Sequence, residues 1–247
     1  MQHDEPIIVP KKNRGDPRVG SDSLMILLPS ELRHLAQVTK ARRVALNDAA
    51  VSRIYLVDGE GSRTLTLCGP FLGAPQAVMA MEKLIALGIK RIWMLGWCGS
   101  LKTTVKVGDL VLPTFAFSDE GTSRHYPIGS DRPSTDKELL HTIAHVLEKR
   151  GETAETGPVW TTDAPYRESK EKVKGFQRLG AVAVEMELSA LATVAIYRAI
   201  QFAALLVVSD ELFEYVWRPG FNEPRLKKQT RLAADVLLEA ASSFSAD

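Results

Sequence analysis

Short apolar segments of strand-like composition alternate along this chain with segments of helical spacing, and this alternation limits what the chain can fold into. The strand-like segments are 23–28, 90–95, 110–117, 157–162, 181–186 and 202–209, and the helical ones are 29–40, 76–87, 135–150, 167–179, 187–199 and 223–244. Such alternation predicts a mainly parallel sheet covered by helices. We therefore expect an α/β protein with a three-layer α/β/α architecture, plus a hairpin of segments 53–57 and 63–68 around the turn Asp58-Gly59-Glu60-Gly61.

The length and composition indicate one domain. The chain has 247 residues, of which 45% are hydrophobic, and this is enough to bury a single large core. Residues 1–22 contain three prolines and a basic cluster, so we expect them to form an extended or mobile lead-in. Residues 23–247 are expected to form the domain.

The net charge, the two cysteines and the apolar runs limit the partners and the location that we expect. Lys and Arg number 31 against 30 Asp and Glu, so the net charge of +1 favours neither a nucleic-acid nor a membrane partner. Cys68 and Cys98 lie inside apolar segments and are expected to be buried, reduced thiols. The first residues lack the apolar core of a secretion signal, and no apolar run is long enough to span a membrane. We expect a cytoplasmic protein without a metal site.

Acidic residues follow two of the apolar segments directly. Glu185 and Glu187 flank Met186 where segment 181–186 ends, and Asp210 follows Ser209 at the end of segment 202–209. The carboxyl ends of parallel strands meet at one edge of a sheet, which is where open α/β proteins place their ligand crevices. The small residues of Gly96-Trp97-Cys98-Gly99-Ser100 follow a third strand and would let a ligand approach closely. We expect these strand ends to form one site.

Five motifs, in order, resemble those of the nucleoside phosphorylase family: GWCGSL at 96–101, VGDLVLP at 107–113, EGTSRHY at 120–126, VEMELSAL at 184–191 and VVSDEL at 207–212. The family includes purine nucleoside and uridine phosphorylases and the methylthioadenosine/adenosylhomocysteine nucleosidases. The resemblance spans roughly residues 24–212. It implies a phosphorylase/hydrolase-like fold with a twisted, largely parallel, partly barrel-like sheet. It also implies a homo-oligomer, either a dimer or a hexamer built as a trimer of dimers, with sites near the subunit contacts.

The reaction implied by the resemblance is cleavage of the N-glycosidic bond of a nucleoside. Glu187, with Glu185 and Met186, would bind the ribose, because a carboxylate can accept from two hydroxyl groups and favours the positive charge that develops on the sugar. Asp210, with Ser209, would contact the base and donate a proton as it leaves. Glu187 could instead only stabilise a helix N-terminus, and Ser209 or Asp210 could be a helix cap. Ser209-Asp210 favours a purine, whereas EGTSRHY resembles uridine phosphorylases.

Two aromatic residues near the end of segment 157–162 are candidates for stacking on the base. Trp160 and Tyr166 lie where the family presents an aromatic ring. Trp160 could equally belong to the core, whereas this is less expected of Tyr166, which follows the turn Ala164-Pro165. His125 and Tyr126 in the polar loop could reach the sugar or the base, and His125 could also be a surface residue.

The phosphate ligands of the family are altered in this chain. The chain contains Gly15-Asp16-Pro17-Arg18, which resembles part of the family's Gly-Asp-Pro-x-Arg pattern, but no strand precedes it, so we interpret it as a chance turn. The first strand leads instead into Ser30 and Glu31, and Met94 and Trp97 replace an arginine and a hydroxyl residue. The remaining candidates for phosphate contact are Arg33, Gly73, Gly96, Trp97 and Ser123, with His34 or Arg124 as possible substitutes.

Three functions fit these residues, and phosphorolysis is the one that we expect. Phosphorolysis to free base and ribose 1-phosphate, with inorganic phosphate as co-substrate and no other cofactor, is favoured by the prevalence of phosphorylases in the family. The altered phosphate ligands favour a nucleosidase-type hydrolase, in which Glu31 or Glu185 could orient the water. A non-catalytic nucleoside-binding protein is the third alternative. A Rossmann dehydrogenase is excluded, because no G-x-G-x-x-G sequence opens a helix after the first strand.

Overall fold

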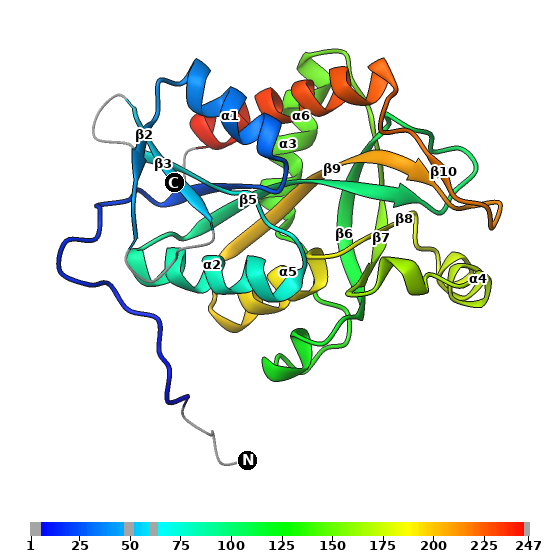
Figure 1. Cartoon of the computed structure of the whole chain (residues 1–247), viewed down its shortest axis with the longest axis horizontal. Helices are drawn as coiled ribbons and strands as arrows, with labels where there is room; N and C mark the ends of the chain where they lie inside the picture. Colours follow the sequence, from blue (N-terminus) through cyan, green and yellow to red (C-terminus); the bar gives the residue numbers. More distant parts are fainter. Residues whose placement is uncertain (1–5, 47–51, 60–63, 245–247) are drawn as a thin grey trace.

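The computed structural model describes residues 6–46, 52–59 and 64–244 and shows a mixed sheet between two groups of helices (Figure 1). The strands are β1 (Asp22–Ile26), β2 (Arg42–Val44), β3 (Arg53–Asp58), β4 (Thr64–Gly69), β5 (Arg91–Ser100), β6 (Leu110–Asp119), β7 (Ala154–Thr162), β8 (Ala183–Glu185), β9 (Gln201–Glu211) and β10 (Arg218–Pro219). The helices are α1 (Pro29–Val38), α2 (Ala74–Leu87), α3 (Lys137–Lys149), α4 (Lys170–Arg178), α5 (Leu188–Tyr197) and α6 (Pro224–Ser243), with short 3₁₀ turns η2 (Ser123–His125) and η3 (Pro165–Arg167).

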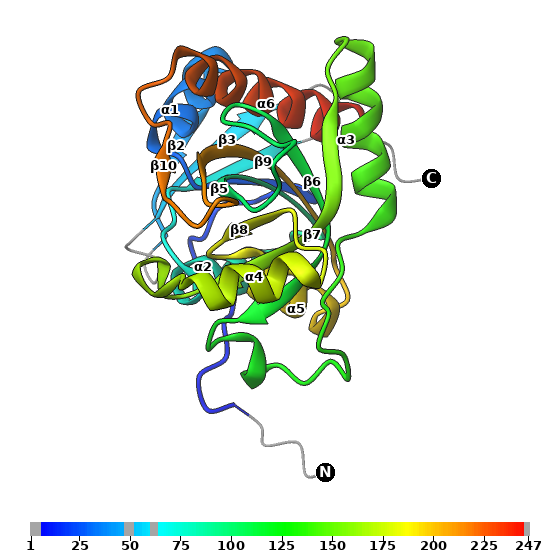
Figure 2. The same cartoon turned by 90° about the vertical axis from the view of Figure 1, so that its right-hand side faces the viewer.

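The sheet closes on itself through a pairing between β5 and β9. Its strand order is β10-β9-β6-β7-β8-β5-β1-β4-β3-β2, and the additional β5–β9 pairing makes a closed ring of β5, β6, β7, β8 and β9 (Figure 2). Parallel pairs join β1 to β4 and β5, β5 to β9, and β7 to β6 and β8. The remaining pairs are antiparallel. The predicted α/β fold with a partly barrel-like sheet is confirmed, and the sheet is mixed where a largely parallel one was expected.

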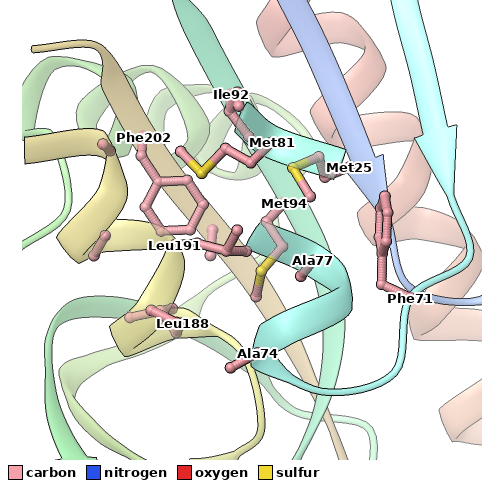
Figure 3. Close-up of a cluster of buried hydrophobic side chains, with 14 of the residues drawn as sticks. Met25, Phe71, Ala74, Ala77, Met81, Ile92, Met94, Leu188, Leu191 and Phe202 are labelled. Carbon is pink, nitrogen blue, oxygen red and sulfur yellow. The ribbon is translucent and has the colours of Figure 1, made fainter. Parts of the chain in front are cut away.

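Helices cover both faces of this sheet. In Figure 1, α1 and α6 lie above the sheet, α3 lies behind it, and α2 and α5 lie below it. Each group buries its own apolar cluster against the strands. In the lower cluster, Met81 of α2 and Leu191 of α5 meet Met94 of β5 and Phe202 of β9 (Figure 3). Burial of these side chains therefore fixes α2 and α5 against the central strands.

Several element boundaries differ from the predictions. Strand β5 continues through Gly96 to Ser100 and does not end at Leu95, because β9 pairs with it along its full length. A Cβ atom at Gly99 would lie 2.4 Å from Cδ1 of Leu212, so the glycine leaves room for this side chain. Ser30 lies inside α1 and does not cap it, since the N-cap position is Leu28. The short strands β2 and β10 were not predicted.

The lead-in is anchored to α2 by a charged pair. Residues 6–21 contain no helix or strand, but the ammonium group of Lys83 lies 2.8 Å from the Asp16 carboxylate, and both side chains are almost fully buried. Hydrogen bonds from Lys83 and from the backbone N–H of Asn13 lower the pKa of Asp16. The sequence Gly15-Asp16-Pro17-Arg18 thus contributes a structural anchor. Within the described ranges, no helix is long and apolar enough to cross a membrane.

Replacing Leu191 by alanine should lower the free energy of unfolding by about 2–5 kcal/mol, because its side chain is fully buried in the cluster of Figure 3. Urea denaturation followed by circular dichroism measures the change. The control is Leu179→Ala, at a side chain that is 56% exposed. Equal losses for the two variants would contradict the packing described.

Candidate active site

A cavity of about 630 Å³ opens at the carboxyl ends of β1, β5, β8 and β9. The segments before α2 and α4 and on either side of β10 complete its wall. It is lined by Leu27, Leu28, Phe71, Leu72, Trp97, Cys98, Gly99, Pro165, Tyr166, Glu168, Val184, Glu185, Met186, Glu187, Ser209, Asp210, Leu212, Trp217 and Phe221. The structure therefore brings Glu187 and Asp210, which are distant in the sequence, to one cavity. Four of these lining residues are acidic, and none is Lys, Arg or His.

Glu185 is bound by the protein itself. One carboxylate oxygen accepts hydrogen bonds from the backbone N–H groups of Glu187 and Leu188, both at 2.7 Å, and the other is bonded to the hydroxyl of Thr161. A carboxylate in this position satisfies the free N–H groups at the start of α5. Burial raises the pKa of Glu185 to about 7, and these hydrogen bonds oppose that rise. Glu185 is thus a helix cap with little capacity left for a substrate.

Glu187, two residues further along the chain at the start of α5, lines the same cavity. Its side chain is only 4% exposed, and its carboxylate accepts a hydrogen bond of 2.6 Å from the backbone N–H of Gly73. Gly73 precedes α2 with φ of 85°, a conformation that favours glycine. Burial, and then the charge of Glu185, raise the pKa of Glu187 to about 8. Ligand hydroxyl groups that donate to this carboxylate would favour its ionised form.

Asp210 lies at the end of β9 and is held by two neighbours. One oxygen lies 2.6 Å from the hydroxyl of Ser209, and the other accepts a hydrogen bond of 2.9 Å from the indole N–H of Trp217. The Trp217 ring packs edge-on to Phe221, which stacks on Trp97. Trp217 therefore joins the acidic end of the cavity to its aromatic wall.

Glu168 was not predicted as a site residue. It follows η3, lines the cavity and is half buried. Burial raises its pKa to about 7, the charge of Asp210 adds to this rise, and Lys172 opposes it. Glu168 and Asp210 are therefore electrostatically coupled at one end of the cavity. The only signal in the sequence was the neighbouring turn Ala164-Pro165, which had drawn attention to Tyr166.

The two aromatic candidates occupy different environments. Tyr166 lines the cavity and is fully exposed at its mouth. Trp160 is fully buried, donates its indole N–H to Asp119 and stacks on Phe176 with ring centroids 4.4 Å apart. A base cannot stack on a ring that is enclosed in this way, so Trp160 is a core residue and not a base contact.

Most of the phosphate candidates lie away from the cavity. Arg33 is exposed on α1 and does not line the cavity, and neither does Gly96 within β5. The Ser123 hydroxyl accepts a hydrogen bond from Thr193, and the Gly73 N–H donates to Glu187. Trp97 does line the cavity, but its N–H donates to Thr230.

The other polar candidates also have partners elsewhere. Glu31 is buried against Arg231, and His34 lies 2.9 Å from Asp235. Tyr126 packs against Tyr197. His125 and Arg124 belong to η2, which contributes no residue to the cavity wall.

Comparison with known proteins identifies the family. The family model of the phosphorylase superfamily matches residues 24–241. The chain belongs to the phosphorylase superfamily. Among curated proteins, a guanosine phosphorylase of Halorubrum lacusprofundi is 31% identical over 148 residues, covering 60% of this chain and 61% of that protein. A DeoD-type purine nucleoside phosphorylase of Bacillus cereus is 31% identical over 153 residues, covering 61% and 65%. The match thus spans less than two thirds of these relatives.

Two solved structures of the superfamily share the fold over most of the chain. Uridine phosphorylase from Vibrio fischeri is 24% identical with a TM-score of 0.80, covering 92% of this chain and 94% of its own. AMP nucleosidase from Bacteroides thetaiotaomicron is 28% identical with a TM-score of 0.70, covering 90% and 89%. Phosphorylases and a nucleosidase are therefore both similar to this superfamily member.

The free energy of unfolding should fall less between pH 5 and pH 8 when Glu187 is replaced by glutamine. The pKa of Glu187 is about 8 in the folded protein against 4.5 ordinarily, so the folded state binds more protons over this range and its stability falls as the pH rises. Removing the group should make this fall smaller, while the contribution of Glu185 remains. Urea titrations at both pH values measure it, and exposed Glu171→Gln is the control. Parallel profiles for all three proteins would contradict the assigned environment.

Proposed function

We propose that this superfamily member cleaves the N-glycosidic bond of a nucleoside by hydrolysis, giving free base and free sugar. The observation that carries the choice of water over phosphate is the charge of the cavity wall. Its described lining contains four carboxyl groups and no Lys, Arg or His. Burying a phosphate dianion among carboxylates without a cation is strongly unfavourable.

Two backbone N–H groups of the turn before α2 are already engaged within the protein. The N–H of Leu72 donates to Gln76, and the N–H of Gly73 donates to Glu187. The N-terminus of α2, which could otherwise bind an anion, therefore already receives a carboxylate from the protein. Leu27 and Leu28 follow β1 into the cavity as apolar groups. These contacts support water as the nucleophile.

The remaining polar groups fit the two ends of a nucleoside. Glu187 is assigned to the sugar hydroxyls, where its charge would stabilise the positive charge that develops on the ribose. Met186 lies beside it in the wall. Asp210 and Glu168 are assigned to the base, with Tyr166 and Trp217 as aromatic surfaces. A purine is favoured because acidic groups at this end can protonate a ring nitrogen or accept hydrogen bonds from the base.

Phosphorolysis is the second candidate, and the names of the curated relatives favour it. We expect the purified protein to release base and free ribose from a panel of inosine, guanosine, adenosine, methylthioadenosine and uridine, at rates that inorganic phosphate does not change. Chromatography of the base and identification of the sugar measure this outcome. Ribose 1-phosphate formed only with phosphate would establish phosphorolysis, and no base release would favour a binding protein.

Glu187→Gln should lower kcat/KM by roughly 100-fold or more, because an amide cannot supply the negative charge that stabilises the sugar in the transition state. The variant should remain folded, since glutamine can still accept the Gly73 hydrogen bond. The matched control is Glu171→Gln in the exposed first turn of α4. Unchanged steady-state kinetics in Glu187→Gln would remove this residue from the sugar site.

A further inference from the structure

The carboxyl group of Glu168 is a polar group of the cavity that the predicted site did not include. It lies between η3 and α4, is half buried and borders the cavity. Within the described ranges, no hydrogen bond or ion pair engages this carboxyl. A group in this position can therefore give its proton to a ligand without first breaking a contact in the protein.

Asp210 differs from Glu168 in this respect. Its two oxygens are already engaged by Ser209 and by Trp217. An indole N–H can only donate a hydrogen bond, so one oxygen of Asp210 acts as an acceptor there. These contacts fix the orientation of the Asp210 carboxyl group, and its charge acts on Glu168.

The charges around Glu168 come from two packed elements and from across the cavity. Asp210 of β9 is the acidic group that acts on it most strongly, and Lys172 of α4 is the basic one. Lys172 lies 2.7 Å from Asp119, so part of its charge is already neutralised. Glu185 and Glu187 border the same cavity. Burial, and then the charge of Asp210, raise the pKa of Glu168 to about 7, so a large fraction of Glu168 is protonated near neutral pH.

We infer that Glu168 is the general acid that protonates the departing base and that Asp210 is the positioning residue that keeps it protonated. This inference rests on the proposed hydrolysis. Paired carboxyl groups whose environments separate their proton affinities commonly divide the acid and base roles in this way. The resemblance had assigned the proton to Asp210 alone.

The step is balanced without another reactant. The oxygen of water bonds to the anomeric carbon of the sugar as the bond from that carbon to the base nitrogen breaks. The electron pair of the broken bond stays on the base, which takes the proton of Glu168. The proton lost by the attacking water returns to the Glu168 carboxylate through solvent. The products are free sugar and neutral base.

A base that already carries a positive charge tests this role directly. 7-Methylguanosine at pH 6 leaves as a neutral base without taking up a proton, whereas guanosine requires one. Glu168→Gln should lower kcat/KM for guanosine by roughly 100-fold or more and change the value for 7-methylguanosine little. Glu171→Gln is the matched control, and Glu168→Asp should recover part of the activity on guanosine.

The pH profile separates an acid from a merely structural group. The wild-type kcat/KM for guanosine should fall above pH 7, and the profile of Glu168→Gln should lack this alkaline limb. In Asp210→Asn the alkaline limb should move to lower pH, because the variant removes the charge that raises the pKa of Glu168. Equal losses on both substrates in Glu168→Gln, or an unchanged limb, would overturn the acid role while leaving hydrolysis intact. No base release by the wild-type protein would instead overturn the proposed function, and the acid role with it.

Discussion

The parallel pairing of β5 with β9 is the interaction on which the rest of this structure depends. It converts an open sheet into a closed ring, and it brings the end of β9 against the end of β5, which also pairs with β8. At the far end of the pairing, the absence of a side chain at Gly99 leaves room for Leu212. Asp210 and Glu187 meet at one cavity as a direct result of this closure.

A second constraint is the burial of several carboxyl groups in one small volume. The fold accommodates two of them at helix N-termini, with Glu185 at the start of α5 and Glu187 at the start of α2. The partial positive charge and the free N–H groups of these helix ends offset part of the cost of desolvating the acids. The compensation is incomplete, because the pKa values of Glu185 and Glu187 remain raised to about 7 and about 8. An acidic site of this kind has a functional use only if its ligand supplies donors or positive charge.

The sequence predicted those features that depend on local pattern. The helices, the long strands and the positions of Glu187 and Asp210 follow from periodicity and from where apolar runs end. Glu168 and Trp217 were missed, because they lie in irregular connections that only tertiary packing brings to the cavity. Trp160 was a candidate on sequence position alone, and its enclosure against Phe176 was not visible in the pattern. Short edge strands such as β2 and β10 lack a periodic signal altogether.

The residues that replace the family's phosphate ligands act together on the cavity wall. Loss of an arginine alone would leave a polar hole, which water or another cation could fill. Here Met94 is buried in the core, Trp97 is fixed by Thr230, and Leu27 and Leu28 extend the apolar wall. The N–H groups of Leu72 and Gly73 before α2 are engaged as well. The described wall therefore offers apolar or already engaged groups and no cation at this position, and together these support the proposed hydrolysis more strongly than any single missing residue could.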